Sequence, residues 1–551
     1  MSEPGFVNIA ACLSDIARTR PHSLAVVCPA GRDRAGRARH THRTFQQLDR
    51  ESDRIAKALD ANGMGRGVRT VLMVKPSLES FALTFALFKA GAVPVFIDPG
   101  MGIKNLGRCL SEAEPEAFIG IPKAQAARRL LGWGRETIRV ALTVNRGLTS
   151  TDGIRNPPHS EEPFTIARTR GDETAAILFT SGSTGPPKGA IYTHAIFEAQ
   201  VQLLRSLYAI EPGEIDLCTF PLFALFAPAL GMTAIIPEMD ATRPARVDPT
   251  KIIEAIEDFG VTNLFGSPAL IRRVGDYGAA HGLKLPSLRR VISAGAPVSA
   301  RIIERFSALL APAARIFTPY GATEALPVCS IGSDEILGET RHQTDRGEGV
   351  CVGRPVEGNR VEIIRIRDDP IAEWSDDLAL PAGEVGEIAV QGPVVTRSYI
   401  NRPEATALAK IADPTGGGPF HRMGDLGYRD GRGRIWFCGR KSHRVVTPDG
   451  TLFTIPCEAV FNTHPEVART ALVGVGPRGA MRPVLCVEPL RRPGRADLDR
   501  LRRELLALGA SRPHTGSIAT VLFHLSFPVD IRHNAKIFRE KLATWAARRL
   551  R

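Results

Sequence analysis

Hydrophobic residues recur at two different periods along the first hundred residues. Apolar side chains lie three or four positions apart over residues 8–20 and again over 44–59, and this spacing predicts two amphipathic helices. In the second helix Asp53 falls among polar neighbours, so the pattern predicts that it faces solvent. Continuous apolar runs at 68–74 and 93–97 predict buried strands.

The alternation continues and predicts an α/β fold. A helix is expected over 80–89 between those two strands, and the run 175–179 predicts a further buried strand. Strands that alternate with helices are typical of doubly wound α/β layers. The chain has 551 residues, which is too long for one ordinary domain.

One uncharged stretch is long enough to cross a bilayer. It runs from Leu217 to Ala234 and contains Pro221, Pro228 and Gly231, which would interrupt a helix repeatedly. We therefore predict that it forms the wall of an apolar pocket and that the chain has no transmembrane segment.

Charge and cysteine content narrow the class of protein. The formal net charge is +13, but the arginines are scattered, aromatic residues make up only 6%, and no nucleic-acid-binding motif is found. The excess of positive charge suits an anionic substrate such as ATP rather than nucleic acid. The nine cysteines are dispersed without a C-x-x-C pair, which argues against disulfides or zinc and favours a reducing cytoplasm. The first twenty residues lack the apolar core of a signal peptide.

A loop of small and hydroxylated residues follows the strand at 175–179. Its glycines let backbone N–H groups converge on one anion, while hydroxyls and one lysine add further donors. It lacks the Walker A spacing, and taken alone it could be an ordinary connecting loop. Its candidate phosphate-binding residues are Thr180, Ser181, Gly182, Ser183, Thr184, Gly185 and Lys188.

This loop resembles the phosphate loop of the adenylate-forming superfamily, which contains acyl-CoA synthetases, peptide-synthetase adenylation domains and firefly luciferase. Segments further along resemble its other motifs, in the same order: 293–297, 318–324, 383–388, 399–404, 421–427, 436–442 and 527–537. Because the set covers nearly the whole chain, the resemblance is specific. It implies an ATP-dependent, AMP-forming ligase that makes acyl adenylates, with ATP and Mg²⁺ as cofactors.

The resemblance also implies roles for individual residues. The small residues Gly295, Ala296 and Pro297 would let the backbone approach adenine. In the segment 318–324, the Tyr320 ring would pack on adenine beside Gly321, the Thr323 hydroxyl would hold the α-phosphate, and Glu324 would ligate Mg²⁺.

Three residues near the end of the chain complete this implied site. The two carboxylate oxygens of Asp425 would accept both ribose hydroxyls, and Arg440 would contact ribose or phosphate. Lys536 occupies the place of the catalytic lysine, although Ala535 stands before it where glycine is usual. Ser442 stands where the hinge position usually carries aspartate or lysine.

The resemblance further implies a division of the chain. Residues 1–439 would form a large N-terminal adenylation domain of doubly wound α/β subdomains plus a β-barrel-like part. Residues 440–551 would form a small, mobile α+β domain that swings about the hinge.

Several runs, including 221–231, 265–270 and 527–536, closely resemble OleC-type β-lactone synthetases of long-chain olefin biosynthesis. This implies a β-hydroxy fatty acid substrate and, within that lipid pathway, possible complexes with a β-lactone decarboxylase and a ketone reductase. A long-chain fatty acyl-CoA synthetase remains the alternative, and a catalytically inactive adenylate-binding protein is a third possibility. His194 and His443 are candidates, by position only, for the base that deprotonates the hydroxyl. The substrate pocket is assigned to Phe220, Phe223, Phe226 and Gly266.

Overall fold

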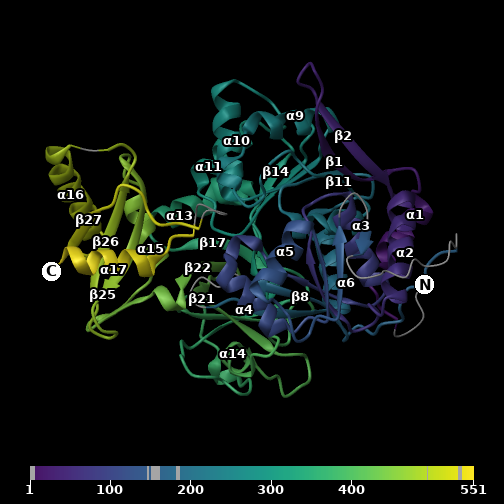
Figure 1. Ribbon diagram of the computed structural model, residues 1–551. Coiled ribbons are helices and arrows are strands. Elements are labelled where there is room, and N and C mark those ends of the chain that lie inside the picture. The colour runs from purple at the N-terminus through teal and green to yellow at the C-terminus, as the bar shows by residue number, and fades with distance from the viewer. Residues whose placement is uncertain are drawn as a thin grey trace.

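The computed structural model describes residues 6–144, 148–150, 162–180, 186–492, 494–530 and 536–550. Figure 1 shows a large part built from the N-terminal and central elements and a smaller part, in yellow-green and yellow, at one end of the molecule. Within the described ranges, no helix combines the length and the apolar character needed to cross a membrane.

The first sheet carries the strand that leads into the phosphate loop. Its order is β7-β6-β5-β3-β4-β8-β9, with parallel pairs in the middle and antiparallel pairs at both edges. Its strands are β3 (Arg69–Met73), β4 (Val93–Phe96), β5 (Ala117–Gly120), β6 (Val140–Val144), β7 (Leu148–Ser150), β8 (Thr174–Thr180) and β9 (Lys188–Thr193). Helices α2 (Phe45–Ala61), α3 (Leu78–Lys89), α4 (Ile103–Ala113), α5 (Pro122–Leu131) and α6 (His194–Tyr208) accompany these strands in the chain.

The solvent-facing position predicted for Asp53 is wrong. Asp53 is only 8% exposed because α2 packs against α3, and the Nζ of the fully buried Lys89 lies 2.6 Å from Oδ1 of both Asp49 and Asp53. A lysine buried at a helix interface needs a counter-charge, and the two aspartates supply it.

The second sheet has the order β14-β13-β12-β10-β11-β1-β2 and is parallel except for the β1–β2 pair. Its strands are β1 (Leu24–Arg32), β2 (Ala38–Thr44), β10 (Ile215–Cys218), β11 (Thr233–Ile235), β12 (Asn263–Gly266), β13 (Arg290–Ser293) and β14 (Arg315–Phe317). The associated helices are α1 (Ala11–Thr19), α7 (Pro221–Ala224), α8 (Phe226–Ala229), α9 (Pro249–Phe259), α10 (Pro268–Ala280) and α11 (Ala300–Ser307). Both prolines that argue against a membrane span interrupt this stretch: Pro221 begins α7, and Pro228 lies inside the short α8.

A third, antiparallel sheet forms the strand-rich part of the chain. Its order is β15-β16-β17-β22-β21-β19-β18, and β20 pairs with β21. The strands are β15 (Tyr320–Ala322), β16 (Ala325–Ser330), β17 (Val350–Pro355), β18 (Arg360–Ile364), β19 (Gly386–Gln391), β20 (Lys410–Ile411), β21 (Phe420–Arg429) and β22 (Ile435–Arg440). Short helices lie between them: α12 (Ser333–Glu335), η3 (Ile336–Thr340), α13 (Arg341–Asp345), η4 (Asp376–Leu378) and α14 (Pro403–Ala409).

The last hundred residues form separate small sheets. After η5 (Lys441–His443), a hairpin joins β23 (Val445–Thr447) to β24 (Gly450–Leu452). A three-stranded sheet, β25 (Val467–Val475), β26 (Arg482–Pro489) and β27 (Thr520–Phe523), carries α15 (Thr454–Asn462), α16 (Arg495–Ala510) and α17 (Arg539–Arg549). The predicted fold class, α/β with a strand-rich part and a smaller C-terminal part, is confirmed.

Candidate active site

Strands β15, β21 and β22 bring three predicted nucleotide-binding residues together. The Tyr320 hydroxyl donates a hydrogen bond of 2.7 Å to Oδ2 of Asp425, and Nη1 of Arg440 lies 3.1 Å from Oδ1 of the same carboxylate. The β21–β22 register explains the second contact, because Asp425 is paired with Arg440 across the strands. Asp425 is 3% exposed, and this burial raises the pKa of its carboxyl.

Lys536, near the end of the chain, acts electrostatically on the same carboxylate. Its positive charge, like that of Arg440, opposes the rise in the pKa of Asp425. The N–H of Asp530 donates a hydrogen bond of 2.9 Å to the Lys536 carbonyl, which joins the two residues that flank the segment 531–535. A positive charge from the smaller part of the molecule therefore acts on a carboxylate of the larger part.

Glu324 is held by contacts from a second direction. The Tyr399 hydroxyl donates a hydrogen bond of 2.7 Å to Oε1 of Glu324, and the backbone N–H of Thr396 donates one of 2.9 Å to the Glu324 carbonyl. The Tyr192 hydroxyl donates to the carbonyl of Thr323. These three contacts fix both the backbone and the carboxylate of the segment 323–324.

Lys188 lies beside this cluster. Its Nζ is 5.0 Å from the centroid of the Tyr399 ring, within the range of a cation–π contact. Gly189 lets the backbone of β9 lie close to Ile400, the residue after Tyr399, because a Cβ at position 189 would come within 2.6 Å of the Ile400 side chain. In the backbone, Lys188 pairs with Thr180 across the β8–β9 hairpin. The predicted loop residues 181–185 lie outside the described ranges.

The loop predicted to lie against adenine leaves the carboxyl end of β13, where ligands of parallel sheets commonly bind. Gly295 has a φ of +95°, a conformation that glycine adopts readily, and Ala296 and Pro297 follow it. Gly321 is required for a different reason, because a Cβ there would lie 2.6 Å from the carbonyl oxygen of Ala325.

The donor set at Glu324 fits a magnesium ion. No cluster of three or more potential ligands of the His, Cys, Asp or Glu type occurs within the described ranges. Magnesium, however, usually takes one or two carboxylates and completes its shell with water and substrate phosphate. Glu324 is partly exposed and provides one such carboxylate.

An apolar cavity of about 80 Å³ lies next to these motifs. Phe223, Phe226 and Phe265 line it, and the ring centroids of Phe223 and Phe265 are 4.7 Å apart. The ring of Phe220 packs against that of Phe223, with centroids 5.3 Å apart, and Gly266 directly follows Phe265 in the sequence. The stretch from Leu217 to Ala234 therefore supplies part of a pocket wall, as predicted.

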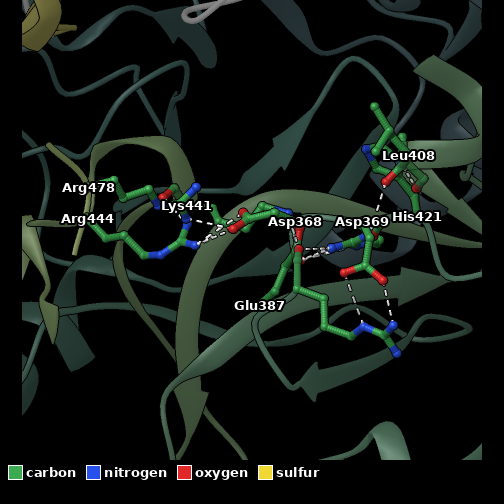
Figure 2. A network of polar contacts seen from close by, with 11 residues as sticks. Asp368, Asp369, Glu387, Leu408, His421, Lys441, Arg444 and Arg478 are labelled. Atoms are coloured by element: carbon green, nitrogen blue, oxygen red, sulfur yellow. Dashed lines mark hydrogen bonds and ion pairs between the residues drawn. The ribbon is translucent and has the colours of Figure 1, made fainter. Parts of the chain in front are cut away.

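Polar contacts connect the two parts of the molecule near η5. Figure 2 shows Arg444 and Arg478 converging on Asp368, with nitrogen–oxygen distances of 3.0 and 2.7 Å. Beside them, Glu387 pairs with Arg422 at 2.7 Å and with Lys441 at 3.0 Å. Asp368 and Glu387 precede the predicted boundary at residue 439, and three of their cationic partners follow it.

The two candidate histidines occupy structural positions. Nδ1 of His194 accepts a hydrogen bond from the backbone N–H of Ile9 at 3.3 Å, and burial lowers the pKa of His194 to about 4. Nε2 of His443 lies 2.9 Å from Oε1 of Glu540.

Sequence reasoning missed several polar residues of this region. Tyr399 begins the segment 399–404, which resembles a family motif, but the resemblance implies no contact for it with Glu324. Lys410, which is 8% exposed, carries no local signal at all. Gln200, Asp216 and Asn263 line the apolar cavity, although each sits in an otherwise unremarkable helix or strand.

These features define an enzyme that binds adenylate, and the chain belongs to the AMP-binding enzyme family, whose sequence profile matches residues 13–400. Within that family it is 51% identical over 548 residues to the olefin beta-lactone synthetase of Xanthomonas campestris pv. campestris, covering 98% of this chain and 97% of the relative. It is 52% identical over 553 residues to the olefin beta-lactone synthetase of Stenotrophomonas maltophilia, covering 98% of each. The resemblance inferred from the sequence motifs is thus confirmed.

Solved structures support the fold. The amide bond synthetase McbA from Marinactinospora thermotolerans superposes with a TM-score of 0.78 at 23% identity, covering 98% of this chain and 99% of that one. The anthranilate CoA ligase AuaEII in complex with anthranoyl-AMP gives a TM-score of 0.79 at 19% identity, covering 100% and 99%.

Proposed function

We propose that this protein is an ATP-dependent β-lactone synthetase that adenylates a β-hydroxy fatty acid and cyclises the acyl-AMP. The observation that carries the proposal is the identity of just over half of all residues, along nearly the full length, with two olefin beta-lactone synthetases. The convergence of Lys536, Arg440 and Asp425 in one place supports it.

In the first step a carboxylate oxygen of the fatty acid attacks the α-phosphorus of ATP, and pyrophosphate leaves. Both reactants are anions, so their approach requires positive charge in the site. Lys188 and Lys536 would supply this charge, together with backbone donors of the loop 180–185. Glu324 would hold Mg²⁺, which neutralises charge on the phosphates when bound.

Nucleotide contacts follow from the arrangement of the third sheet. Asp425 would accept the ribose hydroxyls, Tyr320 would pack on adenine beside Gly321 and the loop 295–297, and Thr323 would bind the α-phosphate. The oxygen Oδ1 of Asp425 is buried and makes no well-aligned hydrogen bond within the described residues, so it is available to a ribose donor.

In the second step the β-hydroxyl oxygen attacks the acyl carbonyl carbon, the bond to AMP breaks, and the hydroxyl proton is released. The product is a four-membered β-lactone. Because nucleophile and carbonyl belong to one molecule, the protein's main task is to hold them in a reactive pose. The apolar cavity lined by Phe223 and Phe226, with Phe220 and Gly266 beside it, would take acyl carbons.

The test is to supply the protein with ATP, Mg²⁺ and a β-hydroxy fatty acid, with and without CoA, and to identify products by mass spectrometry. Formation of lactone, AMP and pyrophosphate without CoA is expected. Acyl-CoA as the only product would overturn the proposal in favour of a long-chain fatty acyl-CoA synthetase. Lys536→Ala should lower AMP formation by about 10²–10³-fold, whereas equal rates would indicate a catalytically inactive protein.

We also propose that residues 1–439 and 440–551 act as two domains about the segment 440–442. The protein would work in the cytoplasm, in long-chain olefin biosynthesis. There a ketone reductase would supply its hydroxy acid and a β-lactone decarboxylase would consume its product, and both are proposed as partners in a complex.

A further inference from the structure

Gln200 lines the apolar cavity, and the acceptor oxygen of its amide has no donor among the described residues. Gln200, on α6, is 3% exposed, and its Nε2 donates a hydrogen bond of 2.8 Å to the carbonyl oxygen of Leu326. A carbonyl oxygen only accepts hydrogen bonds, so this contact fixes which end of the amide is nitrogen. The other end, Oε1, is buried and has no partner among the described residues.

A second amide in the same cavity repeats the pattern. Asn263, on β12, is 4% exposed, and its Nδ2 donates to Oδ1 of Asp216. Its own Oδ1 is likewise buried without a partner in the described part of the chain. Buried polar atoms are nearly always hydrogen-bonded, so two unpaired acceptors in one cavity indicate a ligand that brings a donor.

The position of Gln200 relates this acceptor to the reacting end of the substrate. Its partner Leu326 lies two residues after Glu324, on the strand that leaves the nucleotide-binding motif. Ala294 and Pro319, from the two nucleotide-binding segments, line the same cavity. Gln200 is therefore fixed to the backbone beside the proposed adenylate site.

The chemistry of the cavity restricts the donor. Phe226 and Leu204 are among the apolar lining residues. The acidic residue Asp216 also lines the cavity, but it already accepts a hydrogen bond from Asn263, and burial raises the pKa of its carboxyl, so a charged ammonium group would be disfavoured. A ketone or a carboxylate offers no donor to an amide oxygen. A neutral hydroxyl on an otherwise apolar chain satisfies both conditions.

We propose that Oε1 of Gln200 accepts a hydrogen bond from the hydroxyl of the bound acid, which makes Gln200 a specificity-determining and positioning residue. The contact selects hydroxylated acids over plain fatty acids and holds the hydroxyl oxygen near the acyl carbonyl. An amide does not take up the proton, so Gln200 orients the nucleophile rather than acting as a base. This inference rests on the proposed function.

The experiment compares Gln200→Met with wild type on two acids of equal length, one with a 3-hydroxyl group and one without. ATP–pyrophosphate exchange gives kcat/KM for each acid. General damage to the cavity lowers both values alike, so the ratio of hydroxylated to plain acid is the readout. We expect this ratio to fall about tenfold, the effect of one neutral hydrogen bond.

Gln343→Met is the matched control. Gln343 also donates from Nε2, to Glu348 at 3.1 Å, and also has a buried Oε1 without a partner, but it lies on α13 and does not line the cavity. The ratio of kcat/KM for hydroxylated to plain acid should be the same in Gln343→Met as in wild type. An unchanged ratio in Gln200→Met would overturn the inference, and it is also the result expected if a water molecule rather than the substrate occupies this acceptor.

A product assay separates this inference from the proposed function. With the hydroxylated acid and ATP, Gln200→Met should release a larger share of its acyl-AMP as free acid instead of lactone. If wild type forms lactone, but Gln200→Met keeps the wild-type ratio of kcat/KM for the two acids and the wild-type share of lactone, the inference fails and the proposed function stands. If wild type forms no lactone, the proposed function fails, while a tenfold fall in the exchange ratio would still support the hydroxyl contact.

Discussion

The hydroxyl of Tyr320 and the carboxylate of Asp425 are joined by a hydrogen bond of 2.7 Å between strands β15 and β21. On the other side of the carboxylate, Arg440 lies 3.1 Å from Oδ1 as an ion pair without good hydrogen-bond alignment. Tyrosine and arginine thus hold Asp425 in one orientation while one of its oxygens keeps an open acceptor position. A site prepared in this way loses little entropy when a donor arrives.

Asp425→Asn is expected to weaken ATP use with little change in size at the site. The substitution removes the negative charge that faces Arg440 and leaves only one acceptor oxygen. A hydrogen bond to a charged group contributes about 1.5–3 kcal/mol, so kcat/KM for ATP should fall about 10–100-fold. Pyrophosphate exchange at varied ATP measures it. Tyr320→Phe should lower the same constant less, and an unchanged constant in Asp425→Asn would contradict the ribose-binding role.

Local signals predicted most elements and the order of the motifs. The helix predicted over 80–89 is α3, and the apolar run 93–97 is β4, because period and burial are properties of the local chain. Only the resemblance to a known family assigns Tyr320 and Asp425 to one nucleotide site. Their contact joins distant strands, and periodicity does not show which strands pair.

Buried polar groups were the residues that sequence reasoning could not place. Asp53 has the pattern of a surface residue, but it is buried because Lys89 of a neighbouring helix requires a counter-charge. Gln200 and Lys410 have no distinctive neighbours in the sequence, and their partners Leu326 and Thr396 lie 126 and 14 residues away, beyond the reach of a helical or strand period. Such pairs are set by tertiary packing, so only the structure identifies them.

Glu387→Gln is expected to destabilise the fold strongly. Glu387 and Arg422 are each 1% exposed in their side chains, and Glu387 also pairs with Lys441 at 3.0 Å. Removing the carboxylate leaves two cations close together with little solvent. Breaking a buried pair in this way costs about 3–5 kcal/mol, which urea unfolding would detect.

The exposed pair between Asp15 and Arg18 provides the comparison for this measurement. Both side chains are more than half exposed, so Asp15→Asn should change stability by less than about 0.5 kcal/mol. Equal effects of the two substitutions would show that the buried network around Glu387 contributes no more than a surface contact.

Asp368→Asn is expected to loosen the connection between the two parts of the molecule without unfolding either. Asp368 is half exposed and pairs with Arg444 and Arg478, which both follow η5 in the chain. Because the Asp368 carboxylate is half exposed to solvent, each of its pairs is worth only about 0–1 kcal/mol, although Arg444 itself is 9% exposed, so amide exchange over residues 441–444 should rise about two- to fivefold. Exchange in β25 and β26 should stay unchanged.

Asp369→Asn is the control for that experiment. The neighbouring Asp369 pairs with Arg367, on the same side of the predicted boundary. Its substitution should leave exchange at 441–444 as in wild type. If both variants behave alike, Asp368 does not hold the two parts together.

Comparing wild type with Lys410→Met is expected to show that Lys410 loses its proton near neutral pH in the folded protein. Burial lowers the pKa of Lys410 from 10.5 to about 7, partly opposed by the negative charge of Glu324. Its Nζ donates to the carbonyl and the hydroxyl of Thr396, contacts that a neutral amine can also make. The folded protein therefore favours the uncharged form.

The sign of the effect follows from proton binding. Between about pH 7 and pH 10 the unfolded chain keeps the proton on residue 410 while the folded chain has released it, so the stability of wild type rises with pH. The methionine variant lacks this proton, so the free energy of unfolding of wild type relative to Lys410→Met should increase over that range, by at most about 1.4 kcal/mol per pH unit. Below about pH 7 both states of wild type hold the proton, and the difference should level off. Urea unfolding of both proteins at pH 6, 7, 8 and 9, with the exposed Lys284→Met as a variant whose difference from wild type stays constant, measures it. A difference for Lys410→Met that stays flat up to pH 9 would mean that Glu324 keeps Lys410 charged in the folded protein, and the positive charge beside Glu324 would then persist at working pH.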